Sequence, residues 1–313
     1  MKSAAPMSAR GTVADWLRLL RPAQWTKNGI ILVAYFFARW DPGQHAHVVG
    51  AAPFLAVVLA LLDFCLLASG VYVLNDLIDR KADALHPEKC NRPLASGRIA
   101  PSAALALALA LLTTSVAGAW LLAPRFGVIA SVYLLMQIAY SGLLKHVAIL
   151  DVFIIALGFV LRATAGAAVI DARISPWLLL CAFFLALFLA LCKRRHEKQL
   201  LVGEGAGHRR SLTGYSLVLL DQMIACVAAS TVIAYAVYTL SPETIQRFGT
   251  QGLGLTIPLV MFGIFRYLDL VYNDNGGGRP EHILLTDKIL IGTILLYVLT
   301  ASAVFLVARH AAL

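Results

Sequence analysis

Oxygen-bearing side chains recur at helical spacing where a long apolar stretch of the chain ends. Asn75, Asp79 and Asp83 stand four residues apart, so a continuous helix would align them on one stripe. Tyr72 and Asp76 flank that stripe. Such ligands suit Mg²⁺, which takes a few protein carboxylates and completes its shell with substrate phosphates. The spacing therefore indicates a magnesium site at a membrane surface, and the simpler alternative is a solvated helix end whose carboxylates only face water.

A basic loop follows the acidic stripe directly. Lys89, Arg92 and Arg98 lie in a segment interrupted by prolines and a glycine. Where carboxylates hold a metal, neighbouring cations can bind the phosphate oxygens that the metal leaves uncovered. The stripe and the loop together therefore favour a magnesium pyrophosphate as ligand over the solvated helix end.

The composition indicates an integral membrane protein. Hydrophobic residues make up 60% of the 313 residues and the mean hydropathy is +0.78, well above the range of soluble domains. The apolar stretches cover residues 25–40, 53–75, 103–123, 126–144, 149–170, 176–192, 214–240, 253–273 and 288–308. We therefore predict an all-α fold of nine transmembrane helices. Residues 1–313 would form one membrane domain, with residues 1–24 as an N-terminal cytoplasmic or interfacial segment.

Positive charges are distributed unevenly over the loops between these stretches. Most of the 26 Lys and Arg residues fall on the N-terminus and on the loops that share its side of the membrane. Lys and Arg are enriched on the cytoplasmic side. We therefore expect the N-terminus and the acidic stripe to face the cytoplasm, in a multi-pass inner-membrane protein. The net charge of +9 then follows from topology and an anionic substrate, and no nucleic acid partner is needed to explain it.

The acidic stripe and the basic loop resemble the first signature of the UbiA superfamily of intramembrane prenyltransferases. That signature reads Asn-Asp-x-x-Asp-x-x-x-Asp, as at residues 75–83, and an Arg-Pro-Leu/Ile-x-x-Gly loop follows it, as at residues 92–97. The resemblance implies a UbiA-like helix bundle with a cytoplasm-facing active-site cavity and Mg²⁺ as cofactor. It also implies a side opening to lipid for a polyprenyl chain.

The chain departs from the family pattern where the sixth apolar stretch ends. The superfamily has a second aspartate-rich motif there, whereas this chain has Lys193, Arg194 and Arg195. A second acidic cluster would hold a second Mg²⁺ on a prenyl diphosphate, but cations would receive anionic oxygens directly. The alternative is that these cations only anchor the helix end on the cytoplasmic side.

This departure, together with motifs at residues 140–146 and 158–163, resembles one branch of the superfamily. That branch is the decaprenyl-phosphate phosphoribosyltransferases, which transfer 5-phosphoribosyl from phosphoribosyl pyrophosphate (PRPP) to a polyprenyl phosphate and release pyrophosphate. The resemblance assigns PRPP binding to Lys27, Tyr72, Lys89, Arg92, Lys193, Arg194 and Arg195, polyprenyl phosphate binding to Lys145 and Arg162, metal binding to Asn75 and Asp79, and catalysis to Asp76, Asp79 and Asp83. The division of the basic residues between donor and acceptor stays open. Lys27 alone also fits a lysine that extends to the membrane surface.

Arg162 lies in the middle of an apolar stretch, where an unpaired charge costs at least a few kcal/mol. Asp151 shares its helix face but lies about 16 Å away along the axis, too far for an ion pair. A bound phosphate is the better partner, and Asp63 from another helix is the structural alternative. Arg266 differs, because Asp269 three residues later can pair with it locally.

Two other functions fit parts of the pattern. A UbiA-type aromatic prenyltransferase would share the first motif and use a prenyl diphosphate, but the missing second acidic motif counts against it. A transporter of an anionic solute would fit the helices, the basic loops and Arg162, yet it leaves the acidic stripe unexplained. A homo-oligomer is compatible with the sequence.

Overall fold

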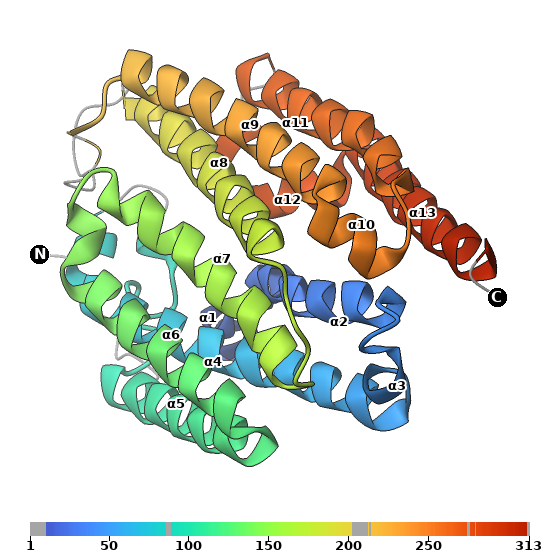
Figure 1. Ribbon diagram of the computed structural model, residues 1–313. Helices are drawn as coiled ribbons and strands as arrows, with labels where there is room; N and C mark the ends of the chain where they lie inside the picture. The colour runs from blue at the N-terminus through green and yellow to red at the C-terminus, as the bar shows by residue number, and fades with distance from the viewer. Residues whose placement is uncertain are drawn as a thin grey trace, which may run out of the picture.

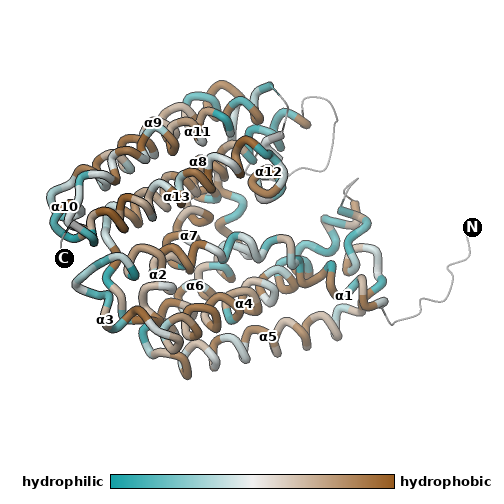
Figure 2. The backbone as a smooth tube through the Cα atoms, turned by 90° about the vertical axis from the view of Figure 1, so that its right-hand side faces the viewer, coloured by the Kyte–Doolittle hydropathy of each residue, from teal (hydrophilic) through white to brown (hydrophobic). Residues whose placement is uncertain are grey.

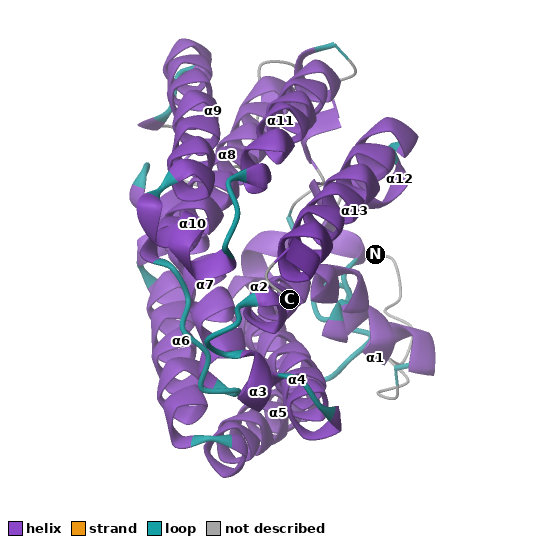
Figure 3. Cartoon of the chain, turned by 45° about the vertical axis from the view of Figure 1, so that its right-hand side comes forward, coloured by secondary structure: helices purple, strands orange, loops and turns teal. Residues whose placement is uncertain are grey.

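Helices joined by turns and loops make up the whole described chain, as Figure 3 shows. The computed structural model describes residues 11–85, 89–201, 212, 214–273, 276–278 and 280–311. Five of the cations behind the expected orientation lie outside these residues: Lys2, Arg10, Arg209, Arg210 and Arg279.

The helices form two groups. In chain order the elements are α1 (Val13–Leu20), η1 (Pro22–Ile30), α2 (Ile31–Trp40), α3 (His45–Val48), α4 (Ala51–Asp83), η2 (Lys89–Asn91), α5 (Pro101–Leu122), α6 (Pro124–Gly142), η3 (Leu144–His146), α7 (Leu150–Ala168), α8 (Pro176–Leu201), α9 (Leu217–Leu240), α10 (Pro242–Phe248), η5 (Gly252–Thr256), α11 (Ile257–Tyr272), η6 (Gly276–Gly278), α12 (Pro280–Thr286) and α13 (Lys288–Ala311). Helices α4 to α7 form one group, and α8, α9, α11 and α13 form the other (Figure 1). The two groups join where α7 packs against α8.

Helix α2 connects the two groups through its two faces. Its Ile31 and Ala38 belong to the core between α4, α6 and α7. Its Phe37 belongs to the other core and meets Tyr238 and Phe305 edge to face, with ring centroids 5.9 and 6.3 Å apart. The apolar side chains of one short helix therefore fix how the two groups sit relative to each other.

Polar segments gather at the two ends of the bundle, and apolar residues cover its middle (Figure 2). Helices α1 and α12 lie at one end, and α3 and α10 at the other. At the α10 end, the guanidinium of Arg247 pairs with Asp41 over 2.5 Å and also donates to the Arg173 carbonyl. This distribution is that of a protein that crosses a membrane.

Seven described helices are long and apolar enough to cross a bilayer, so the count of nine is not confirmed. The seven are α4, α5, α7, α8, α9, α13 and a span that joins η5 to α11. The other two predicted stretches correspond to α2 and α6. Helix α2 has ten residues and is about 15 Å long, half of an apolar core of about 30 Å. Helix α6 has 19 residues, includes the polar Arg125 and Gln137, and is not among the seven.

Helix α1 delivers the chain to the acidic end of α4. Thr12 caps it, because its hydroxyl accepts from the Asp15 amide while the Asp15 carboxylate accepts from the Thr12 amide. Leu19 is fully buried against Val73 of α4. The helix ends at Arg21, whose φ of 54° reverses the chain into η1 and brings the Arg21 guanidinium to α4.

Two close approaches depend on glycine. A Cβ at Gly166 of α7 would overlap the backbone of Ile31, so only glycine lets the η1–α2 junction lie on α7. A Cβ at Gly278 of η6 would overlap the His196 ring of α8. The glycine run at η6 therefore packs closely against α8.

Candidate active site

The acidic stripe forms one continuous helical surface, but its two edges have different partners. At about 100° per residue, the five polar residues fall within an arc of about 100°. At one edge, Asn75 and Asp79 face Lys145, whose Nζ lies 3.3 Å from Asn75 Oδ1 and 2.6 Å from Asp79 Oδ1. At the other edge, Asp76 and Asp83 face Arg92. The predicted stripe is therefore one surface with two separate ion-pair clusters.

Arg92 and Arg21 hold the buried edge of the stripe. The Arg92 Nη1 lies 3.0 Å from Asp76 Oδ1 and 2.7 Å from Asp83 Oδ2. Arg21 adds a second contact of 2.5 Å to Asp76 Oδ1, and its guanidinium lies over the Tyr72 ring. Arg92, predicted to bind PRPP, thus closes the basic loop onto α4. Arg21 was not predicted as a site residue, although it precedes the Pro22 that starts η1.

Asp79 is the most accessible carboxylate of the stripe. Its side chain is 29% exposed, against 3% for Asp76 and 7% for Asp83. Asn75 beside it is partly exposed as well. A ligand that approaches from this end of the bundle therefore meets the amide of Asn75 and the carboxylate of Asp79 first.

The donor set at this edge fits Mg²⁺. Among the described residues, no three His, Cys, Asp or Glu side chains lie close enough together to hold a metal ion by themselves. Mg²⁺ does not need such a cage, because it binds through one or two carboxylates and takes its other oxygens from water and substrate phosphates. One amide and one carboxylate already converge on a positive charge here, the Lys145 ammonium.

Lys145 does not lie beside Arg162, with which it was expected to hold the acceptor phosphate. It occupies η3, between α6 and α7, and is only 4% exposed. Arg162 lies twelve residues into α7, about 18 Å along the helix axis from its start. The two cations therefore sit at different depths of the bundle, and their joint binding of the acceptor phosphate stays a prediction.

Arg162 is buried among neutral partners. Its Nε donates to Asn28 Oδ1 over 2.8 Å, and its Nη2 donates to the Tyr133 hydroxyl over 2.6 Å. The guanidinium also lies over the Tyr133 and Phe159 rings. Its hydrogen bonds go to Asn28 and Tyr133 and not to Asp63, whose Oδ2 has no hydrogen-bond partner in the described chain. No described carboxylate forms an ion pair with Arg162, so its charge is not compensated by these residues.

Asn28 and Tyr133 are functional candidates that the sequence analysis missed. Asn28 is fully buried, and its amide nitrogen also contacts Cys65 Sγ at 3.3 Å. Nearby in η1, the Trp25 ring nitrogen donates to the Ser69 hydroxyl. Lys27, which was predicted to bind PRPP, contacts Gln24 over 2.5 Å. The available signal was Arg162 itself, because a buried guanidinium requires polar partners on neighbouring helices.

The cations at the end of α8 form ion pairs within the protein. Arg194 is 3% exposed, lies 3.3 Å from Asp151 Oδ2 and also pairs with Glu197. Arg195 contacts Asp221 over 2.6 Å and stacks on the Tyr272 ring. These two cations therefore tie α8 to its neighbours.

Lys193 and Lys89 are the remaining residues that were predicted to bind PRPP. Lys193 lies on α8 directly before Arg194, and Lys89 begins η2. Both side chains are partly exposed. Lys193 therefore lies beside the ion-paired Arg194 of α8, and Lys89 lies in the loop that Arg92 holds to α4.

The local pair predicted for Arg266 is confirmed. Arg266 contacts Asp269 over 2.6 Å, and it gains a second carboxylate, Asp287, at 2.7 Å. Asp287 lies just before α13, and the hydrogen bond from Arg266 holds its pKa below the usual range. Arg266 therefore connects α11 to the start of α13.

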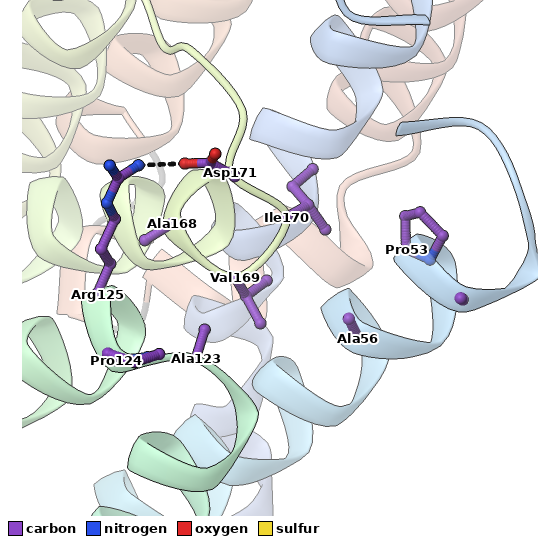
Figure 4. A pocket seen from close by; sticks show the side chains of 10 residues that line it. Pro53, Ala56, Ala123, Pro124, Arg125, Ala168, Val169, Ile170 and Asp171 are labelled. Atoms are coloured by element: carbon purple, nitrogen blue, oxygen red, sulfur yellow. Dashed lines mark hydrogen bonds and ion pairs between the residues drawn. The ribbon is translucent and has the colours of Figure 1, made fainter. Parts of the chain in front are cut away.

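A cleft of about 630 Å³ lies away from this chemistry (Figure 4). Its lining comes from the beginning of α4, the α5–α6 turn and the end of α7, and is mainly Ala and Pro. At its rim, Arg125 and Asp171 pair with each other. The cleft begins at Ala52, about 40 Å along α4 from Asp79, so it does not belong to the acidic site.

Comparison with known proteins identifies the family of this chain. Residues 30–275 match the model of the UbiA prenyltransferase family, and the chain therefore belongs to this family of membrane transferases. It is 33% identical over 292 residues to decaprenyl-phosphate phosphoribosyltransferase of Mycobacterium tuberculosis, covering 93% of this chain and 94% of that protein. The enzyme of the same name from Mycolicibacterium smegmatis is 34% identical, with 91% and 92% covered.

A solved structure supports the architecture. A UbiA homolog from Archaeoglobus fulgidus bound to GPP and Mg²⁺ superposes with a TM-score of 0.69, covering 93% of this chain and 99% of that one. Its sequence identity is 23%, so this likeness concerns the fold. The all-α UbiA-like bundle predicted from the sequence is confirmed.

Proposed function

We propose that this protein transfers 5-phosphoribosyl from PRPP to a polyprenyl phosphate of the decaprenyl type, at the cytoplasmic face of the inner membrane. The N-terminus and the acidic end of α4 then both face the cytoplasm. The observation that carries the proposal is that the chain has an acidic motif on α4 and, near the end of α8, cations in place of a second acidic motif. The likeness over more than nine tenths of two decaprenyl-phosphate phosphoribosyltransferases supports it.

The exposed edge of the stripe is the proposed donor site. Asn75 and Asp79 would hold Mg²⁺, which supplies positive charge to the pyrophosphate that leaves. Lys145 lies 2.6 Å from Asp79, so it would exchange that contact for a donor phosphate oxygen. Tyr72 and Lys27 would orient PRPP from the adjoining surfaces of α4 and η1.

The buried edge would keep the donor site in shape. Asp76 and Asp83 hold Arg92, and through it the loop that carries Lys89. Lys89 and Lys193 remain proposed phosphate ligands. A direct role for Arg194 and Arg195 requires their carboxylate partners to be replaced by phosphate oxygens.

Arg162 is the residue proposed to contact the phosphate of the acceptor lipid. Its guanidinium has two neutral hydrogen-bond acceptors and no described carboxylate partner, so an anion in its vicinity would balance the charge. A polyprenyl phosphate could extend its head from the lipid toward this depth.

In the proposed reaction, an oxygen of the lipid phosphate forms a bond to the ribose C1. The bond between C1 and the donor pyrophosphate breaks, and the pyrophosphate leaves with the electron pair of that bond. The acceptor oxygen is already anionic, so the protein needs no strong base. Its residues act by alignment and by electrostatic stabilisation of the charge that develops on the leaving group.

The deciding experiment offers two substrate pairs to the purified protein with Mg²⁺. Labelled PRPP with decaprenyl phosphate should yield labelled lipid and pyrophosphate. Geranyl diphosphate with an aromatic acceptor should give no product. Turnover of the second pair alone would replace this proposal with the aromatic prenyltransferase, which the fold also accommodates. Uptake of an anionic solute into vesicles without turnover of either pair would favour the transporter.

A further inference from the structure

The turn between η3 and α7 has a backbone that its sequence does not favour. Ile149 adopts φ 70° and ψ −52°. Positive φ is costly for a β-branched residue, and such conformations persist where the surrounding structure holds them. Ile149 lies four residues after Lys145, so this turn sets the direction from which Lys145 reaches Asp79.

One hydroxyl group holds the turn from both sides. The Ile149 amide donates to the Tyr215 hydroxyl over 2.5 Å, and that hydroxyl donates to Asp151 Oδ1 over 2.8 Å. Tyr215 is 2% exposed and Asp151 is fully buried. Tyr215 therefore bridges the strained residue and the first turn of α7.

Two further contacts fix this bridge. The Arg194 Nε lies 3.3 Å from Asp151 Oδ2, which ties the carboxylate to α8. A Cβ at Gly214 would lie 2.7 Å from Ala148 Cβ, so the segment before α9 approaches the turn as closely as only glycine allows. Arg194 of α8 and the segment before α9 thus both pack against the region of this turn.

We infer that Tyr215 is a positioning residue, which fixes Lys145 against Asp79 through Ile149 and Asp151. Its hydroxyl contacts Ile149 and Asp151, so it acts on Lys145 through the turn. In this arrangement Arg194 orients Asp151 and so belongs to the same network. The effect on turnover rests on the proposed function, whereas the effect on Lys145 itself does not.

The first test measures Lys145 directly, without any substrate. Tyr215→Phe keeps the ring and removes both hydroxyl contacts. An amine-reactive reagent is applied to the purified full-length protein in lipid nanodiscs, and the Lys145 labelling rate is measured by mass spectrometry. We expect labelling to rise roughly tenfold, the equivalent of one lost hydrogen bond. Unchanged Lys145 labelling would overturn the inference.

Tyr235→Phe is the matched control. Tyr235 lies on α9, the helix that follows Tyr215, is likewise buried and shares a hydrogen bond of 2.6 Å with Thr256, but it is far from η3. Its replacement should leave Lys145 labelling unchanged. A similar rise in both variants would mean that general loosening exposes Lys145, and would also overturn the inference. If Tyr215→Phe does not fold, Gly214→Ala perturbs the same turn through Ala148 and takes its place.

The second test asks whether Tyr215 acts through Lys145. Tyr215→Phe should slow PRPP-dependent turnover in the wild-type background and cause no further loss in a Lys145→Ala background. Losses that add would overturn the positioning role. If labelling rises as expected but the wild-type protein shows no PRPP-dependent turnover, the positioning role stands and the proposed reaction fails.

Discussion

The charged residues of the site divide by exposure as well as by partner. Asp76 and Asp83 are nearly inaccessible and share one arginine, whereas Asp79 is partly exposed and shares a lysine with Asn75. A buried carboxylate that loses its partner leaves an uncompensated charge, so replacing one member of the buried cluster costs stability. Replacing Asp79 should instead affect binding.

We therefore expect Asp79→Ala to lower Mg²⁺-dependent turnover by about 100-fold or more, because it removes the accessible carboxylate of the proposed metal site. Pyrophosphate release at several Mg²⁺ concentrations measures the loss, and thermal unfolding should show a folded protein. Asp83→Asn is the contrasting variant, since it should lower the unfolding temperature by breaking the contact to Arg92. Turnover of Asp79→Ala close to wild type at limiting Mg²⁺ would exclude this edge as the metal site.

Arg162→Ala should slow turnover by roughly ten- to a hundredfold at subsaturating polyprenyl phosphate, because a charge-assisted hydrogen bond contributes about 1.5 to 3 kcal/mol. Arg162→Lys should recover part of the loss, since lysine retains the charge but not the planar fork. PRPP binding, measured separately with Mg²⁺, should change much less.

Two outcomes would contradict the acceptor role of Arg162. Equal losses in PRPP binding and in turnover would place Arg162 in the donor site. A loss of stability with unchanged turnover would mean that its contacts to Asn28 and Tyr133 are structural. Arg266→Ala provides the comparison, because Arg266 pairs with two carboxylates outside the site.

At the scale of the elements, the close contact between α7 and the η1–α2 junction brings the site together. It lets Asn28 of η1 reach Arg162 of α7, 134 residues away in the chain. Gly166 makes this contact possible, because any side chain there would overlap the Ile31 backbone.

Gly166→Ala should therefore destabilise the protein by about 1 to 3 kcal/mol, the usual cost of overpacking a core. Gly292→Ala is the matched control, since a Cβ there meets no atom within 4 Å. In α13 that substitution should be neutral or stabilise the fold by up to about 1 kcal/mol. Denaturant or thermal unfolding in detergent compares the two, and equal effects would contradict the packing argument.

At the scale of the whole molecule, the two polar ends of the bundle differ in chemistry. The α1 end carries the acidic stripe and its cations, while the α10 end carries isolated ion pairs such as Arg247 with Asp41. The proposed substrate PRPP is a soluble cytoplasmic anion in this scheme, so the acidic end should face the cytoplasm.

Single-cysteine labelling of intact cells tests that orientation. In a background with Cys90 and Cys226 replaced by serine, the other three cysteines are buried. Exposed Glu243→Cys should react with a membrane-impermeant thiol reagent from outside, whereas exposed Lys81→Cys should react only after permeabilisation. The reverse pattern would place the acidic stripe outside the cell.

Local periodicity determined much of this protein from the sequence alone. The apolar stretches and the four-residue spacing of Asn75, Asp79 and Asp83 predicted a helical membrane protein with an acidic stripe, and Arg266 found Asp269 within one helical turn. Such features depend on a helical repeat of about 3.6 residues, which the sequence carries.

Only the tertiary structure decided which cation meets which carboxylate. Lys145 lies 66 residues from Asp79 and pairs with it, while Arg194 pairs with Asp151 instead of facing open space. Asn28 and Tyr133, from two different elements, hydrogen-bond Arg162, and Asp63, the structural alternative to a phosphate, does not. These contacts follow from how helices pack, and the packing depends on close approaches such as Gly166 on Ile31, which no local repeat encodes.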